Sequence, residues 1–240
     1  GALKSFQSDD VRIAVHEVKE NGVTYYLADI WVRGIDSFKT AFARDKYGGG
    51  RQNMKTLMKN NDAIVAISGD YYGARKKGVV IRNGELYRDT PHVDVCVLYR
   101  NGEMKTYASE EWSAIEDTAQ NVHQAWGFGP MLLDENAKPM TIEQFNGFEF
   151  EKLHPRAAIG YYEPGHYCFV VVDGRKKAHS IGMLLSELST LFHELGCKTA
   201  YNLDGGATAI LGYEGKFVNQ PYDDGRSQYD IIYIARPENP

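Results

Sequence analysis

An aspartate followed by two glycines is the part of this sequence best suited to chemistry. In the segment 202–208 (Asn-Leu-Asp-Gly-Gly-Ala-Thr), an apolar run ends at Asp204, and the glycines allow a sharp turn and close approach of a ligand to bare backbone. The carboxylate would then lie at a strand tip, beside free amides and the Thr208 hydroxyl. Asp-Gly is also ordinary turn chemistry, so the segment alone reads more simply as a tight turn.

A second Asp-Gly pair, at 173–174, follows another apolar run at 167–172. Leucines at helical spacing between 184 and 195 lie between the two runs, and strand, helix, strand predicts a right-handed crossover between parallel strands. Asp173 and Asp204 would then share the sheet edge where open α/β sheets bind ligands. Asp70 ends a third predicted buried strand. It would lie at the same sheet edge as Asp173 and Asp204 if that strand runs parallel to the other two.

Basic side chains accompany these acids. Arg156 follows His154 and Pro155 at the start of a predicted strand, Arg175 follows the second Asp-Gly pair, and Arg226 precedes the last strand. Arginine's planar fork suits phosphate and carboxylate alike, although a single arginine is more often a weak surface ion pair. His154 suits acid/base chemistry near neutral pH and equally a structural hydrogen bond.

The elements that must position these residues are mostly strands. Asn-Gly pairs at 21–22, 83–84 and 101–102 each separate two β-type segments and predict hairpins. Short helices are predicted at 53–59 and from Ser109. We therefore expect an α+β fold: a single domain with a mixed β-sheet, N-terminal β-hairpins and a C-terminal βαβ crossover. Residues 1–59 would form the hairpin and helix region and 60–240 the part with the site, as one compact unit.

The charge, the apolar runs and the cysteines of the chain argue against several kinds of partner and site. The chain has 240 residues and a net charge of −5, without a Lys/Arg block, so no nucleic-acid partner is expected. No apolar run reaches the ~18 residues of a membrane span. The three cysteines are odd in number and form no Cys-x-x-Cys, which favours neither a disulfide framework nor a zinc site.

Five ordered motifs resemble the phosphodiester glycosidase family. They are Ala66-Ile67-Ser68-Gly69-Asp70-Tyr71-Tyr72, Gly127-Phe128-Gly129-Pro130, His154-Pro155-Arg156-Ala157-Ala158-Ile159-Gly160, Val171-Val172-Asp173-Gly174-Arg175 and Asn202-Leu203-Asp204-Gly205-Gly206. The resemblance covers about residues 60–235. It implies hydrolysis of a sugar-1-phosphodiester, such as a GlcNAc-1-phosphodiester, to free sugar and phosphomonoester. It also implies a cell-surface or exopolysaccharide glycan as substrate and an extracellular or cell-surface location, with an export signal or anchor removed.

The resemblance and the local chemistry together give a candidate site. The candidate catalytic residues are Asp204, Asp70, Arg156 and Asp173. The candidate substrate-binding residues are Arg175, Asn202, Gly205, Gly206, Thr208, His154 and Arg226. Asp204 is the first choice for direct catalysis, and the arginines would stabilise charge on the departing phosphate. The chain departs from the family pattern at Ala157 and Ala207, where hydroxyl-bearing residues or glycine are common.

Other interpretations stay open. Three nearby aspartates would also suit a hard cation such as Ca²⁺ or Mg²⁺; no other cofactor is expected, and the sequence does not give the oligomeric state. A non-catalytic module that binds phosphorylated cell-wall glycan needs the same arginines but no acid/base group. An ordinary glycoside hydrolase would act on substrates that lack phosphate.

Overall fold

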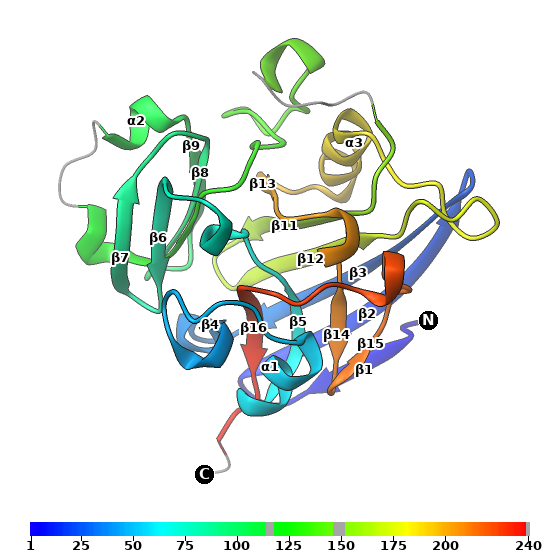
Figure 1. Cartoon of the computed structure of the whole chain (residues 1–240), viewed down its shortest axis with the longest axis horizontal. Coiled ribbons are helices and arrows are strands. Elements are labelled where there is room, and N and C mark those ends of the chain that lie inside the picture. The colour runs from blue at the N-terminus through cyan, green and yellow to red at the C-terminus, as the bar shows by residue number, and fades with distance from the viewer. Residues whose placement is uncertain (114–117, 146–151, 239–240) are drawn as a thin grey trace.

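The strands form three sheets around a common core (Figure 1). A computed structural model describes residues 1–113, 118–145 and 152–238. Strands dominate and helices are few, which confirms the predicted α+β class. Within the described residues, no helix is long and apolar enough to cross a membrane.

The first sheet has six strands in the order β1-β2-β3-β12-β11-β13. Their bounds are β1 Lys4–Gln7, β2 Val11–Glu20, β3 Val23–Val32, β11 Arg156–Glu163, β12 His166–Val172 and β13 Thr199–Asn202. Helix α3 (Leu185–Leu195) connects β12 to β13. Both strands pair antiparallel with β11, so they run parallel to each other with β11 between them.

The structure therefore corrects the prediction of a mixed sheet. All strand pairings among the described residues are antiparallel, including those that flank the crossover. The uninterrupted apolar run in β12 is buried on both faces, as predicted. Here α3 covers one face and the central core the other, so burial on both faces did not require parallel neighbours.

The second and third sheets have five strands each, in the orders β7-β6-β10-β8-β9 and β15-β14-β5-β16-β4. The second contains β6 Gly78–Arg82, β7 Glu85–Thr90, β8 Val95–Tyr99, β9 Met104–Tyr107 and β10 Val122–Trp126. The third contains β4 Phe38–Phe42, β5 Ala63–Ser68, β14 Leu211–Tyr213, β15 Lys216–Phe217 and β16 Asp230–Ala235. The remaining α-helices are α1 Met54–Asn60 and α2 Ser109–Ser113.

The three predicted hairpins are confirmed, and two of them have the same turn type. Asn21 and Gly22 both have positive φ (51° and 75°), as do Asn83 and Gly84 (51° and 85°), which is the signature of a type I′ turn. Only Gly102 of the third pair has positive φ (90°), so that hairpin uses a longer loop.

One apolar core joins the sheets. Ile13 of the first sheet, Trp126 of the second and Ile67 of the third belong to the same buried cluster. The N-terminal region is part of this assembly, because β3 pairs with β12 and β4 pairs with β16. Sites at the strand ends are therefore held by elements from the whole chain.

Candidate active site

Three strands of the first sheet bring the predicted motifs to one edge. Strands β12 and β13 end at this edge and β11 begins there, because Arg156 pairs with Val172 and Ala158 pairs with Asn202. The Gly206 amide donates to the Pro155 carbonyl at 3.1 Å, which ties the Asp-Gly-Gly turn to the start of β11. The expectation that both Asp-Gly pairs share one edge is confirmed.

A cavity of about 340 Å³ opens at this edge. Its lining residues are Phe128, His154, Pro155, Arg156, Arg175, Asn202, Leu203, Gly205, Gly206, Ala207 and Arg226. Seven of the predicted site residues are among them: His154, Arg156, Arg175, Asn202, Gly205, Gly206 and Arg226.

Arg156 is a buried cation without a carboxylate partner among the described residues. Its Nε donates to the Met183 carbonyl and its Nη2 to the Lys152 carbonyl, each at 2.9 Å. Burial, with a smaller contribution from nearby Arg175, lowers the pKa of Arg156 to about 10, so the guanidinium stays charged at neutral pH. A buried positive charge whose partners in the described part of the chain are carbonyls is arranged to receive an anion.

Arg175 lies beside this cation and contacts His154. Its Nη2 is 3.2 Å from His154 Nδ1, and because a guanidinium only donates, Nδ1 is the acceptor when this hydrogen bond forms. The Arg175 guanidinium also stacks 4.7 Å above the ring of Tyr222. Neither cationic side chain forms an ion pair with a carboxylate of residues 1–113, 118–145 or 152–238.

Asp204 provides a carboxylate close to Arg226. It is not itself a lining residue of the cavity, but it lies between the lining residues Leu203 and Gly205 in the chain. It is 9% exposed, and its Oδ2 lies 4.0 Å from Arg226 Nη2. Burial raises the pKa of Asp204 to about 6, while Thr208, Arg226 and Arg75 oppose the shift. A carboxyl group that titrates near neutrality at the margin of a cavity is suited to acid/base work.

Asn202 and Thr208 support the turn that holds Asp204. Asn202 Nδ2 donates to the Gly129 carbonyl at 3.0 Å, which leaves its buried Oδ1 without a hydrogen-bond partner. Thr208 is buried and its hydroxyl donates to the Gly205 carbonyl at 2.6 Å. Asn202 therefore offers an acceptor at the cavity, whereas the Thr208 hydroxyl is bonded within the turn.

The other two predicted carboxylates have partners inside the fold. Asp173 accepts from Asn219, from His179 and from the Gln220 amide, at 2.7–3.1 Å. Asp70 is 1% exposed and lies 2.9 Å from Arg82 Nη2. Neither lines the cavity. In the described part of the chain, no group of three or more acidic, His or Cys side chains is arranged to hold a metal ion.

Three residues that the sequence did not single out contribute to the site. The Arg226 guanidinium lies 5.1 Å above the ring of Tyr71, and Arg75 lies 4.5 Å above Phe128. Phe128 belongs to the Gly-Phe-Gly-Pro motif and could have been weighed individually. Tyr71 directly follows Asp70, but no local pattern marks Arg75.

The loops around the site also hold strained backbone. Tyr71, Arg175, Asp223 and Asp224 are all non-glycine residues with φ between 53° and 60°. Such residues cost free energy and gather where a surrounding structure fixes a functional geometry. Of these four residues only Arg175 lines the cavity, and other residues of this kind occur elsewhere in the described chain, so the feature is not specific to the site.

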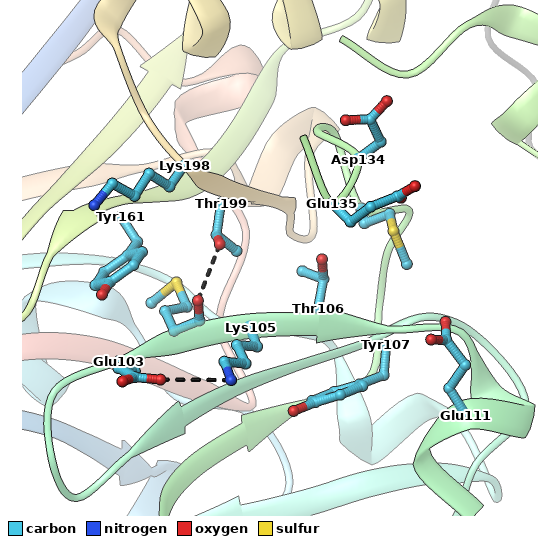
Figure 2. Close-up of a pocket in the computed structure, with 12 residues that line it drawn as sticks. Glu103, Lys105, Thr106, Tyr107, Glu111, Asp134, Glu135, Tyr161, Lys198 and Thr199 are labelled. Atoms are coloured by element: carbon cyan, nitrogen blue, oxygen red, sulfur yellow. Dashed lines mark hydrogen bonds and ion pairs between the residues drawn. The ribbon is translucent and has the colours of Figure 1, made fainter. Parts of the chain in front are cut away.

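A second cavity, of about 450 Å³, has a different character (Figure 2). It lies between β9 and β13, where Thr199 donates to the Met104 carbonyl at 2.9 Å. Its charged lining residues are Glu103, Lys105, Glu111, Asp134, Glu135 and Lys198. Since it contains no arginine and four carboxylates, it does not suit a phosphodiester.

The chain is similar to several known proteins. YomE, an SPbeta prophage-derived uncharacterized protein of Bacillus subtilis (strain 168), is 28% identical over 232 residues. That match covers 93% of the chain, and the chain spans 35% of the relative's length.

Solved structures share the fold at low sequence identity. The zebrafish N-acetylglucosamine-1-phosphodiester alpha-N-acetylglucosaminidase catalytic domain, auto-inhibited by its pro-peptide, superposes with a TM-score of 0.73 at 18% identity, over 95% of this chain and 83% of that one. A putative exported protein from Burkholderia pseudomallei K96243 gives 0.65 at 13% identity, over 91% and 75%. A hypothetical protein from Synechocystis gives 0.64 at 14% identity, over 94% and 62%.

The family model described as phosphodiester glycosidase matches residues 61–235, which include every predicted site residue. The chain therefore belongs to the phosphodiester glycosidase family.

Proposed function

We propose that this protein hydrolyses a sugar-1-phosphodiester, releasing a free sugar and a phosphomonoester. The observation that carries the proposal is the buried Arg156, which has carbonyl partners and no carboxylate partner among the described residues. It lines the same cavity as Leu203 and Gly205, the chain neighbours of Asp204, whose carboxyl group has a pKa near 6. A GlcNAc-1-phosphodiester on a cell-surface glycan or exopolysaccharide is the substrate that the family suggests.

The arginines would bind the phosphate. Arg156 and Arg175 present two charges in one cavity, and Arg226 faces the same space. The leaving phosphomonoester is already a weak base, with a second pKa near ~6, so it needs little protonation. Cationic stabilisation of the developing negative charge matters more, and one such group typically contributes ~10²–10³ in rate.

The carboxylate would act at the sugar. In its ionised form Asp204 either activates water or attacks the anomeric carbon, and the C–O bond breaks as the phosphate departs. Asn202 Oδ1, buried and without a partner, can accept a hydrogen bond from a sugar hydroxyl. Asp173 and Asp70 hold the surrounding loops through their internal partners and support the site from outside the cavity.

The test is hydrolysis of an alkyl GlcNAc-1-phosphodiester in ¹⁸O-water. Wild type should release both products, with the label in the sugar. The ratio kcat/KM should fall as the pH drops through about 6, because the reactive carboxylate becomes protonated. We expect Asp204→Asn to lower kcat by about 10²–10⁴-fold and Arg156→Ala to raise KM and lower kcat together.

The matched control is Glu135→Gln, an exposed carboxylate in the second cavity, which should keep wild-type turnover. Label found only in the phosphate would contradict attack at the sugar. Full activity of both Asp204→Asn and Arg156→Ala would show that the site is elsewhere. Binding of the diester without turnover by the wild type would instead favour the glycan-binding module.

A further inference from the structure

Two basic triplets of identical sequence adjoin the candidate active site. They are Arg75-Lys76-Lys77, directly after the short 3₁₀-helix η3 (Tyr72–Ala74), and Arg175-Lys176-Lys177, directly after the Asp173-Gly174 pair. Each triplet starts with an arginine that contacts the site. Lys76, Lys77 and Lys177 are exposed, and Lys176 is half-buried.

The triplets approach the Asp-Gly-Gly turn from different segments. Arg75 Nη1 donates to the Gly127 carbonyl at 3.4 Å and lowers the pKa of Asp204. On the Arg175 side, a Cβ added at Gly206 would lie 3.4 Å from Arg175 Nη2. In the view of Figure 1, the η3 turn (teal) and the loop after β12 (yellow) lie on either side of the turn that follows β13 (orange).

These charges are not neutralised locally. Within the ranges that the structure describes, none of the four lysines forms an ion pair. Asp223 and Asp224 are exposed acids that lie close to Arg226 in the sequence. In a protein of net charge −5, six cations in two triplets beside one cavity form a local positive field.

A single phosphodiester does not account for this field. The cavity measures about 340 Å³, and its own lining supplies three arginines, Arg156, Arg175 and Arg226, that would serve the scissile phosphate. The lysines lie beyond this set. Lysine is a compact, mobile point charge, suited to phosphates that are not held in one geometry.

We infer that the substrate is a chain of sugars joined by repeated phosphodiester bonds, whose flanking phosphates contact the lysines of the two triplets. This inference rests on the proposed function and specifies its substrate class. Contact with phosphates on both sides of the scissile bond would hold the polymer across the cavity, and the electrostatic part of binding would weaken as salt rises.

The experiment compares two substrates that share the same scissile linkage. One is the alkyl GlcNAc-1-phosphodiester, and the other is an oligomer of about six sugar-1-phosphate units. A variant carrying Lys76→Gln, Lys77→Gln, Lys176→Gln and Lys177→Gln should hydrolyse the simple diester within about twofold of wild type. Its kcat/KM for the oligomer should fall more than about tenfold, mostly through KM.

The control removes the same kind of charge elsewhere. Lys105 and Lys198 line the second cavity (Figure 2), and the pair Lys105→Gln with Lys198→Gln should leave both substrates unaffected. An equal loss in the control and the four-lysine variant would overturn the inference, as would an unchanged kcat/KM of the four-lysine variant for the oligomer.

A binding experiment tests this inference independently of the proposed function. Long-chain inorganic polyphosphate should bind wild type at least about tenfold more tightly, per chain, than it binds the four-lysine variant, whereas orthophosphate should not distinguish them. If the simple diester is not hydrolysed, the proposed function fails and polyphosphate binding still decides the role of the triplets. A DNA oligonucleotide bound as tightly as polyphosphate, with no preference in turnover for the oligomer, would also overturn the inference.

Discussion

The three aspartates of the predicted site are chemically unlike one another. Asp173 and Asp70 are surrounded by internal donors, which use their lone pairs. Asp204 has a longer 4.0 Å contact with Arg226 and a pKa raised by burial to about 6. Local sequence alone, Asp followed by Gly in two cases, could not separate these roles, because the partners come from distant segments.

Asp204 should therefore lower the stability of the folded protein at neutral pH. The pKa of Asp204 is about 6 in the folded protein, above the ordinary value of 3.8. The favourable contribution of this carboxyl group to the free energy of unfolding is therefore complete below pH 3.8 and is lost as the pH rises through about 6. The full shift corresponds to at most about 3 kcal/mol. We expect Asp204→Asn to raise the free energy of unfolding at pH 7 by about 1–3 kcal/mol and to have a smaller effect at pH 4.

Denaturant unfolding at the two pH values measures this difference. The exposed Asp9→Asn is the matched control and should be near neutral at both. A variant that is less stable than wild type at pH 7 would show that the Asp204 carboxylate is a net stabilising group. Gain of stability with loss of turnover would mark a residue retained for function at a cost to the fold.

At the scale of elements, the segment His154-Pro155 is enclosed by glycines. A Cβ at Gly174 would lie 2.6 Å from the Pro155 nitrogen, one at Gly205 2.7 Å from the Pro155 carbonyl oxygen, and one at Gly182 2.6 Å from the His154 carbonyl oxygen. The ends of β12 and β13 thus pack directly on the start of β11, and this contact sets the position of Arg156.

Gly205→Ala should disturb this contact by steric overlap alone. Gly205 has φ −109°, a conformation that alanine can adopt, so backbone strain is not the cause. We expect a loss of about 1–3 kcal/mol in unfolding free energy and at least a tenfold lower kcat/KM. The control Gly34→Ala, where a Cβ meets nothing within 4 Å, should change neither quantity.

Denaturation curves and diester hydrolysis on the two glycine variants check this prediction. Equal behaviour of Gly205→Ala and Gly34→Ala would show that the strand ends can separate without consequence. A loss of activity without loss of stability would place the effect on the position of Arg156 rather than on packing.

The hairpins and the crossover could be predicted because their signals are local. Asn-Gly turns, helical leucine spacing and the apolar run of β12 each act over a few residues. The insertion of β11 between β12 and β13 could not be predicted, because a strand covered on both faces has the same apolar sequence in either arrangement.

At the scale of the whole molecule, Asp70, Arg82 and Asp230 form a buried link. Arg82 ends β6 in the second sheet, and its guanidinium lies 2.9 Å from a carboxylate oxygen of each aspartate. Asp230 begins β16 in the third sheet, and Asp70 follows β5 of the same sheet. The Asp204 amide in turn donates to the Gly69 carbonyl at 3.2 Å, so the link supports the active-site turn.

Removal of the central cation should therefore be costly. Arg82→Met leaves two buried carboxylates without a counter-charge, and we expect a loss of about 3–5 kcal/mol in unfolding free energy. Arg236→Met is the control, because Arg236 pairs with Asp62 and Glu214 at the surface and should contribute less than about 1 kcal/mol. Chemical denaturation of both variants measures the contrast; similar losses would mean that the buried link adds no special stability.

The location of the cavity could be predicted from the five sequence motifs, because seven of the predicted site residues line it. Arg75 and Tyr71 escaped prediction because their importance is spatial: each stacks with a residue far away in the sequence, Phe128 and Arg226 respectively. Pairings of this kind between sheets leave no local sequence pattern.

Ala207 has more freedom to change than the two glycines before it. It lines the cavity with a small, half-buried side chain, directly after two glycines of which Gly205 has no room to change. Larger or hydroxyl-bearing side chains at 207 would alter the shape of the substrate space while the strand contacts stay intact. This position is therefore where natural variation or directed evolution could retune substrate choice most freely, with the rest of the turn as a fixed frame.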